Sequence, residues 1–331
     1  MERALELSGE KSHPTVNLRE VDPDALPKQG DTLVRIAYSS LNYKDGLAIT
    51  GKGRIVRSGF PFVPGIDLVG EVVQTDSTDF FSGDWVIGTG WGIGESHWGG
   101  YSAYQWLDSE WLVPLPQGMA PVDSMVAGTA GLTALIAIDA LEKCGLDSGA
   151  GEVLVTGASG GVGSFAVGAL AALGYEVAAS TGKDDAHDYL MELGAAYVID
   201  RAELSAGPAA PLESGRWAGA IDSVGSSTLA AILAQLKWHA SVAVCGLAAG
   251  ADLQTTVFPF ILRGANMLGV DSNTCPNELR AVLWQRLGSI MKVNPALGRV
   301  GDVVGLDELV PLADEITAGR VTGRIVVDVN D

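Results

Sequence analysis

The chain has 331 residues, of which 47% are hydrophobic and 18% are charged, and its formal net charge is −19. This length and composition predict a globular protein with two domains. The strong negative charge argues against a nucleic acid or an anionic membrane as a partner, because the field of the protein repels phosphate groups. The sequence shows no uncharged apolar run of about 18 residues and no apolar signal region, so we expect a cytoplasmic protein without a membrane span.

The first third of the chain contains short β-branched or aromatic runs bounded by Gly, Pro and Asp: "DTLVRIAYSS", "DLVGEVVQT" and "DWVIGTG". Such runs predict an irregular β-barrel or sandwich. Asn42, Tyr43, Lys44 and Asp45 bring four polar groups together where a strand passes into a helix. Tyr43 is a candidate catalytic proton donor, with Asn42 beside it. The alternative is that Tyr43 stacks beside a cofactor while solvent supplies the proton.

A basic loop follows on this otherwise acidic protein, with Lys52, Arg54 and Arg57 close together. These side chains are candidates for binding the phosphates of a carrier such as coenzyme A. An ordinary solvated loop is the alternative interpretation.

From about Asp123 the chain alternates between apolar strands and amphipathic helices as far as "SVAVCG". This order is typical of βαβ units around a parallel sheet. Beyond Leu247 come "NMLGVDS", a helical pattern over 277–291, a second one near Leu306 to Ala318, and a last strand "GRIVVDV". We expect these last elements to return to the first domain.

A glycine-rich turn follows the strand "EVLVTG" and precedes an alanine-rich helix; it reads Ala158-Ser159-Gly160-Gly161-Val162-Gly163. In dinucleotide-binding βα turns, glycines permit a tight turn and a close approach of the backbone to a pyrophosphate. The helix N-terminus then directs its amides and its dipole at the phosphates. The alternative is a glycine-rich turn that serves packing alone.

The residues at the end of the next strand indicate whether NADH or NADPH is bound, because NAD binders place an acidic residue there. This chain has Ser180, Thr181, Gly182 and Lys183 instead, and these suit a 2′-phosphate. The sequence therefore predicts NADPH rather than NADH. Arg201, after the third strand, is a further candidate for the same phosphate.

The positions of the cysteines and histidines argue against a bound metal. The three cysteines, Cys144, Cys245 and Cys275, lie far apart, which predicts reduced thiols rather than disulfides. The histidines are scattered too, and none lies within four residues of a cysteine. Zinc sites need clustered Cys, His and carboxylate ligands, so we predict that no metal is bound.

Four segments together, "LNYKDGLA", "PGIDLVGEV", "GTAGLTA" and "VTGASGGVG", resemble the zinc-independent medium-chain dehydrogenase/reductase superfamily. More narrowly, "NYKDGLA", "TGK" and "DSNTCP" are similar to the acryloyl-CoA reductase group, which is also described as quinone-oxidoreductase-like. The resemblance extends over essentially the whole chain. It implies an α/β fold in which a Rossmann doubly wound parallel sheet is inserted into a GroES-like β-barrel domain, with the active site in the cleft. The expected boundaries are 1–123 plus 262–331 for the barrel domain and 124–261 for the Rossmann domain.

The resemblance also implies roles for single residues. Asn42 and Tyr43 are expected beside the nicotinamide, Thr129 near its ribose or phosphate, and Leu247 and Ser272 on the nicotinamide side. It further implies that the turn over 159–162 holds the pyrophosphate and that Ser180, Thr181 and Lys183 hold the 2′-phosphate. Zinc-dependent relatives would carry a histidine where Ile66 stands, a glutamate where Asp67 stands and a cysteine near Ser40. These departures agree with the prediction of no metal.

By resemblance, the expected activity is an NADPH-dependent oxidoreductase that reduces the α,β-double bond of a short enoyl-CoA, most concretely acryloyl-CoA to propanoyl-CoA. The first alternative is the reduction of quinones or free enones by the same hydride geometry. A second alternative, of another class, is a protein that binds NADPH without turnover. The segment "NMLGVDS" is a candidate strand for pairing in a homodimer, as in relatives.

Overall fold

The computed structural model describes residues 2–331 and divides into two compact units. Unit 1 comprises the segment that ends at Thr129 together with Ser272–Gly288 and Gly298–Asp331, and unit 2 comprises Ala130–Asp271 and Ser289–Leu297. The units divide the chain at 129/130 and 271/272, whereas the expected domain boundaries lie at 123/124 and 261/262. Beyond residue 261, β13 (Asn266–Gly269) pairs in parallel with the preceding strand and lies in unit 2.

Unit 1 is built on a seven-stranded sheet with the order β14-β15-β3-β4-β5-β7, in which β6 also pairs with β3. Its strands are β3 (Thr32–Leu41), β4 (Asp67–Thr75), β5 (Trp85–Thr89), β6 (Tyr104–Leu107), β7 (Leu112–Pro114), β14 (Gly301–Gly305) and β15 (Arg324–Asp328). A separate antiparallel hairpin is formed by β1 (Arg3–Glu10) and β2 (His13–Glu20). The C-terminal β15 runs antiparallel to β3, with Ile325 opposite Leu41, and this register brings the start of β15 to the end of β3.

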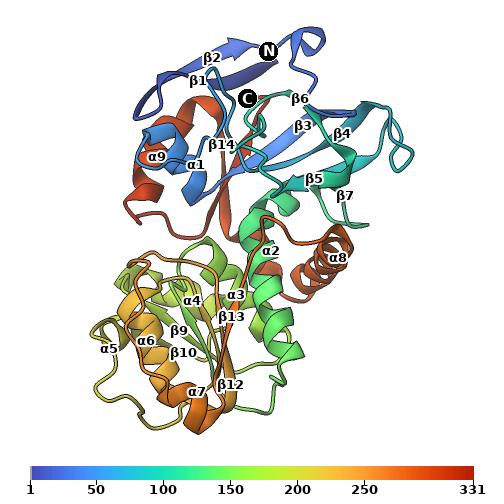
Figure 1. Cartoon of the computed structure of the whole chain (residues 1–331). Coiled ribbons are helices and arrows are strands. Elements are labelled where there is room, and N and C mark those ends of the chain that lie inside the picture. Colours follow the sequence, from blue (N-terminus) through green and yellow to red (C-terminus); the bar gives the residue numbers. More distant parts are fainter. Residues whose placement is uncertain (1) are drawn as a thin grey trace. The chain divides into compact units, whose positions relative to one another are not determined.

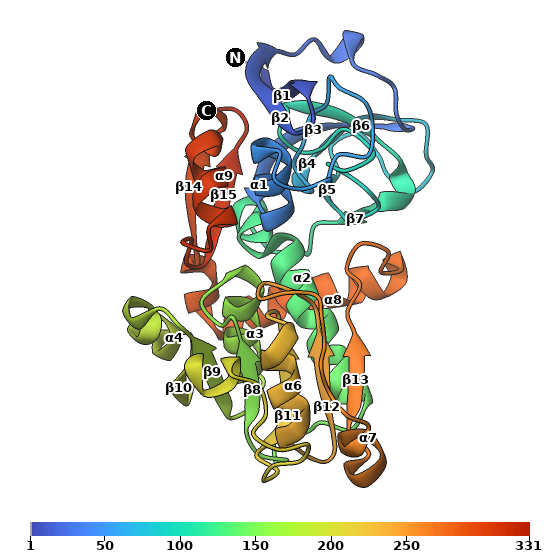
Figure 2. The ribbon, with the colours of Figure 1, turned by 60° about the vertical axis from the view of Figure 1, so that its left-hand side comes forward.

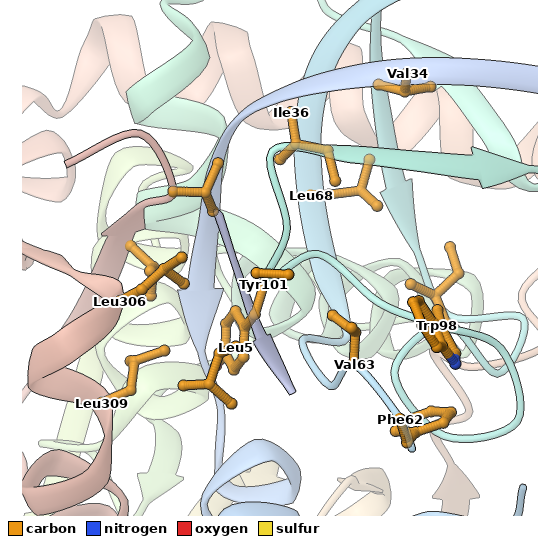
Figure 3. Packing of buried hydrophobic residues seen from close by; sticks show 14 of the residues in the cluster. Leu5, Val34, Ile36, Phe62, Val63, Leu68, Trp98, Tyr101, Leu306 and Leu309 are labelled. Carbon is orange, nitrogen blue, oxygen red and sulfur yellow. The ribbon is translucent and has the colours of Figure 1, made fainter. Parts of the chain in front are cut away.

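Two α-helices of unit 1, α1 (Tyr43–Thr50) and α9 (Leu309–Thr317), pack against each other (Figure 1). Short 3₁₀ turns lie at Pro23–Ala25, Ser109–Trp111 and Leu306–Glu308. The core beneath them gathers apolar side chains from distant segments, among them Leu5, Phe62 and Leu309 (Figure 3). Tyr101 is wholly buried in this core, and its hydroxyl donates a hydrogen bond to the carbonyl of Ser40 (3.1 Å).

Unit 2 is a six-stranded sheet whose strand pairs are all parallel, with the order β10-β9-β8-β11-β12-β13 (Figure 2). Its other strands are β8 (Val153–Thr156), β9 (Val177–Thr181), β10 (Tyr197–Asp200), β11 (Trp217–Asp222) and β12 (Leu236–Val244). Numbered within the unit, this order is 3-2-1-4-5-6, which is the Rossmann order, and its switch point lies between β8 and β11. The predicted Rossmann sheet is confirmed.

The helices of unit 2 connect these strands; they are α3 (Gly161–Ala172), α4 (His187–Glu192), α5 (Ala202–Ser205), α6 (Ser226–Gln235) and α7 (Phe258–Arg263), with a 3₁₀ turn at Asp184–Ala186. Apolar side chains of α6, including Leu229, Ile232 and Leu233, pack against the sheet in one buried cluster with Leu154 and Val242. Burial of these side chains holds α6 against the sheet, and the loops of the candidate site follow the strands of this sheet.

Two long helices contain unit boundaries: α2 (Pro121–Lys143) and α8 (Asn277–Val293), with a 3₁₀ turn at Pro295–Arg299 after α8. Helix α2 is kinked at Gly128, whose dihedral angles (φ 51°, ψ −154°) are not helical. It is also long and apolar enough to cross a bilayer, but 83% of its most apolar window is buried within the protein. A core helix of a soluble protein has the same features.

Candidate active site

The predicted junction of strand and helix lies at the end of β3, where α1 begins. Asn42 is the N-cap of α1 and is extended (φ −112°, ψ 164°). Its backbone N–H donates to Asp45 Oδ2 (2.9 Å), so Asp45 at the third helical position stabilises the start of the helix. Tyr43 follows as the first helical residue with 54% of its surface exposed, and its phenol is therefore accessible to a ligand.

Beneath this junction lies a buried set of side chains, here called the polar cluster: Ser40, Asn42, Asp67, Thr129 and Arg324. Asp67 has no exposed surface and accepts four hydrogen bonds. Oδ1 accepts from Thr129 Oγ1 (2.5 Å), and Oδ2 accepts from Thr129 N (2.9 Å), Ser40 Oγ (2.6 Å) and Asn42 Nδ2 (2.8 Å). The polar cluster thus joins Asn42 and Thr129 through one carboxylate.

Arg324, the first residue of β15, supplies the positive charge of the polar cluster and is only 4% exposed. Its guanidinium donates to Ser40 Oγ (2.8 Å) and Asn42 Oδ1 (3.0 Å). It also donates to the backbone carbonyls of Val126 (3.1 Å) and Leu41 (3.3 Å), and its Nη2 lies 3.6 Å from Asp67 Oδ2. A buried carboxylate requires such compensation, because its desolvation is costly.

Gly128 shows how closely the backbone of α2 approaches the polar cluster. A Cβ on Gly128 would lie 2.8 Å from Arg324 Nη2 and 2.9 Å from Ser40 Oγ, and it would also collide with Asp67. Its positive φ is a second reason for glycine at this position. The kink in α2 therefore allows the Thr129 N–H to point at Asp67.

Asp45 is a second buried carboxylate next to the polar cluster. It accepts hydrogen bonds from the backbone N–H groups of Asn42 and Ile66 (3.0 Å). Burial and the negative charge of Asp67 nevertheless raise the pKa of Asp45 to about 7. The pKa of Tyr101 is also raised, first by burial and then by the negative charges of Asp45 and Asp67. This buried region therefore contains two carboxyl groups, of Asp45 and Asp67, and one guanidinium, of Arg324.

The basic residues predicted to bind a carrier are not all together. Lys52 forms an ion pair with Asp314 (2.9 Å), and Arg57 lies 3.3 Å from Glu95, which also binds Lys44 (2.6 Å). Lys52 and Arg54 line one cavity of about 590 Å³, together with Lys11, Gly51, Val56 and Phe60 among others. Arg57 does not line it, so the cavity unites two of the three predicted residues.

In unit 2 the glycine turn lies at the carboxyl end of β8, at the switch point of the sheet. Gly160 is the N-cap of α3 and Gly161 its first residue. A Cβ on Gly163 would lie 2.6 Å from Ala158 Cα, so glycine is needed there for the helix to pack on the strand. The N–H groups of the first helical turn have no carbonyl partner within α3 and are oriented for an anion.

The neighbouring loop after β11 is held by Asp222, which the sequence analysis missed. Asp222 Oδ1 accepts from Thr156 Oγ1 (2.6 Å) and Oδ2 accepts from Gly225 N (2.8 Å), so the ends of β8 and β11 are joined beside the turn. Burial raises the pKa of Asp222. An acidic residue that ends an apolar strand was the available signal. Arg324 was missed as well, and its signal was a single arginine opening the apolar run "RIVVDV".

The residues predicted for the 2′-phosphate meet at the end of β9. The hydroxyls of Ser159 and Thr181 lie 2.9 Å apart, and the backbone N–H of Lys183 donates to Thr181 Oγ1 (3.2 Å). The side chain of Arg201 lies against Gly182, where a Cβ would collide with it. Burial lowers the pKa of Lys183, and Asp185 acts in the opposite direction. Ser180 is buried within the strand and offers little surface to a ligand.

The two residues expected on the nicotinamide side fall in different units. Leu247 follows β12 in unit 2 with 64% of its surface exposed. Ser272 belongs to unit 1 and is half-buried, and its carbonyl accepts a hydrogen bond from the buried Arg280 (3.1 Å).

Two family models match the chain: the alcohol dehydrogenase GroES-like domain over residues 28–117 and the zinc-binding dehydrogenase domain over residues 161–289. The residues present do not fit a catalytic zinc in the polar cluster, because it offers one carboxylate and a serine hydroxyl but no imidazole or thiolate. That carboxylate is already engaged by four donors and a guanidinium. Across residues 2–331, no group of three or more His, Cys, Asp and Glu side chains has the arrangement of a metal site.

Three similar proteins extend over nearly the whole chain. Acrylyl-CoA reductase AcuI of Ruegeria pomeroyi is 48% identical over 91% of both chains. The "Putative quinone oxidoreductase YhfP" of Bacillus subtilis is 43% identical over 98% of both chains, and a structure of yhfP with NAD bound has a TM-score of 0.94. The structure of YhdH from Escherichia coli with NADPH bound also has a TM-score of 0.94, with 45% identity over 99% of this chain and 100% of that chain. With its Rossmann and GroES-like units, this chain therefore belongs to the medium-chain dehydrogenase/reductase family.

Proposed function

We propose that the protein is an NADPH-dependent reductase of the α,β-double bond of a short enoyl-CoA, with acryloyl-CoA as substrate and propanoyl-CoA as product. The observation that carries the proposal is an exposed phenol, Tyr43, at the start of a helix whose N-cap is held by a buried polar cluster without zinc ligands. Sequence identity of 48% to an acrylyl-CoA reductase supports the choice of substrate. The unit with the Rossmann order supports the choice of a dinucleotide.

Unit 2 is proposed to bind NADPH, which supplies the hydride when bound. The amides that begin α3, from the turn Ser159–Gly160–Gly161–Val162, would hold the pyrophosphate. Thr181, Gly182 and Lys183 would hold the 2′-phosphate with Arg201, because cations beside a hydroxyl and backbone N–H groups suit a dianion. Ser180 would contribute through its backbone, since its side chain is buried. The NADPH bound to YhdH supports this choice of cofactor.

Unit 1 is proposed to supply the polar groups of the reaction. Addition of hydride to the β-carbon places negative charge on the thioester oxygen, and a proton must then reach the α-carbon. Tyr43 is the proposed donor, because its phenol is exposed at the positive end of the α1 dipole. Asn42 is assigned a positioning part instead of direct contact, since both ends of its amide are bonded inside the polar cluster. Delivery of the proton by solvent is the alternative for Tyr43.

The cavity beside the C-terminus of α1 is the proposed site for phosphates of the acyl carrier. Lys52 and Arg54 line it, and Arg54 is exposed without an ion-pair partner among residues 2–331. Arg57 is proposed only as an outer contact, because it already pairs with Glu95. Thr129 is retained as a proposed contact near the ribose or phosphate, and Leu247 and Ser272 as proposed contacts on the nicotinamide side.

The rival function is reduction of quinones or free enones, and the name of YhfP supports it. The two are separated by comparing kcat/KM for acryloyl-CoA, a free enone and a quinone with NADPH. We expect the coenzyme A ester to be preferred. The Arg54→Ala variant should lose about tenfold in kcat/KM for the ester alone, as expected for one charged hydrogen bond.

The matched control is Lys28→Ala, which removes an exposed cation paired with Asp76 in the same unit. It should leave all three values unchanged. Equal kcat/KM for the ester and the free enone, with no selective loss in Arg54→Ala, would favour the rival. If the protein binds NADPH but reduces neither acryloyl-CoA, nor the free enone, nor the quinone, it is a non-catalytic NADPH-binding protein.

We further propose a cytoplasmic homodimer that acts on a small molecule. The edge strand β13 and the adjoining α7 expose apolar side chains, among them Ile261 (68%), Leu262 (51%) and Met267 (47%). Exposed apolar surface beside an unpaired strand edge favours pairing with a second copy. The free thiols of Cys144, Cys245 and Cys275 support a reducing compartment.

A further inference from the structure

We propose that Arg324 is a positioning residue of the reduction: an internal cation that holds Asn42, and through it the start of α1 with Tyr43, in the orientation that the reaction needs. The inference rests on the proposed function, because it concerns the same site. It adds a residue that lies 281 positions from Tyr43 in the sequence and does not itself reach the surface of the site.

The guanidinium of Arg324 contacts several segments of the chain. Its acceptors include two side-chain oxygens, of Ser40 and Asn42, and two backbone carbonyls, of Leu41 and Val126. These acceptors come from the end of β3, the junction to α1 and the first turns of α2. A planar guanidinium carries five N–H donors in a fixed fork, so it can hold several segments at set distances.

Asn42 links Arg324 to the start of α1 and so to Tyr43. The side-chain oxygen of Asn42 accepts from Arg324, and its amide nitrogen donates to Asp67. Both ends of the amide are thus fixed, and the side chain cannot rotate without breaking two buried hydrogen bonds. The carbonyl of Asn42 accepts the first helical hydrogen bond, from Gly46 N (3.0 Å). The direction in which α1 starts, and with it the position of Tyr43, therefore depends on Asn42.

Arg324 also compensates the negative charge of Asp67, which lies 3.6 Å from its Nη2. Asp67 is wholly buried, and it orients Thr129 as well as Asn42. Without a nearby cation its charge would be uncompensated, and its hydrogen bonds would rearrange. The polar cluster has no ligand set for zinc, although one family model that matches this chain is described as a zinc-binding dehydrogenase. The buried cation of the polar cluster is the guanidinium of Arg324. The arginine supplies orientation of the protein and does not activate the substrate.

The test uses the full-length protein with Arg324→Lys, which keeps the charge but loses the fork, and Arg324→Ala. In Arg324→Lys we expect kcat for acryloyl-CoA to fall by about 100-fold, as for a reacting group misplaced by about 1 Å. The Kd of NADPH should change far less than kcat, because the proposed pyrophosphate and 2′-phosphate contacts lie in unit 2. Guanidinium ion should restore part of the kcat of Arg324→Ala, whereas ammonium at the same concentration should not.

The control is Arg320→Lys, the same substitution four residues earlier at an exposed arginine paired with Glu315. It should leave kcat unchanged. Full kcat in Arg324→Lys would overturn the inference. So would a parallel fall in kcat and NADPH affinity in both Arg324 variants without rescue, because that pattern indicates general loss of the fold.

Hydrogen exchange separates this inference from the proposed function. Amides of α1 from Gly46 to Thr50 should exchange faster in Arg324→Lys than in the unchanged protein, and those of α3 should not. If the unchanged protein fails to reduce acryloyl-CoA while this exchange difference is seen, the substrate is wrong and the positioning part holds. Unchanged exchange in α1 would refute the positioning part whatever the substrate.

Discussion

At the scale of single residues, the candidate site contains few groups that remain available for a ligand. Asn42 and Thr129 are both hydrogen-bonded to Asp67, while Tyr43 is exposed. In unit 2, Lys183 and Arg201 are the cations beside the end of β9. Chemistry and recognition therefore depend on a small number of exposed groups that buried neighbours hold in place.

The first residue-scale prediction concerns the choice between NADPH and NADH. Replacing Lys183 with Ala removes a cation from the proposed 2′-phosphate site. We expect the ratio of kcat/KM for NADPH to that for NADH to fall by about tenfold, the loss expected for one charged hydrogen bond. Steady-state kinetics with both cofactors measures this ratio.

Lys237→Ala is the control, because Lys237 lies in the same unit and donates to the carbonyl of Ala150 (3.1 Å), away from the end of β9. It should not change the ratio. If Lys183→Ala also left the ratio unchanged, the assignment of the 2′-phosphate to this loop would be wrong.

At the scale of elements, α1 is the helix on which the account depends. Asp45 accepts the backbone N–H of Asn42 at its start and that of Ile66 before β4, so one carboxyl joins the helix to the next strand. Asp67 is the charged neighbour that raises the pKa of Asp45, and Asp45 in turn raises the pKa of Tyr101. Because Arg324 forms its ion pair with Asp67, no cation among residues 2–331 is paired with Asp45, and its surroundings favour the neutral carboxyl.

Asp45 therefore makes stability depend on pH in an unusual direction. Its pKa is about 7 in the folded protein against an ordinary value of 3.8, so the folded state binds the proton more tightly than the unfolded state does. This favours folding fully below about pH 4, and the contribution is lost as the pH rises through about 7. The free energy of unfolding, measured relative to Asp45→Asn, should thus fall between these values and stay constant above them.

Denaturant unfolding of both proteins at a series of pH values provides the measurement. A difference that rises with pH across this window would mean that Asp45 is ionised and well stabilised in the folded state. In that case, the two backbone hydrogen bonds would outweigh burial and the charge of Asp67.

At the scale of the whole molecule, the sequence predicted those features that are formed by residues close together in the chain. The turn around Gly160 and the end of β9 each lie within one short segment, and their residue types follow from backbone space and charge. Arg324 was not predicted, because its partners lie near residues 40, 67 and 126 and meet it only when β15 pairs with β3. The segment "NMLGVDS" was predicted as a strand, but the place of β13 in the unit 2 sheet follows only from its pairing with β12.

The central claim is that this protein transfers hydride from NADPH to an activated double bond without a metal. The most direct test is a single turnover of NADPH and acryloyl-CoA on chelator-treated protein, followed by NADPH absorbance and by analysis of the product. We predict that one propanoyl-CoA forms for each NADPH oxidised, at a rate that added zinc does not change. Turnover that requires stoichiometric zinc, or NADPH oxidation without propanoyl-CoA, would contradict the account.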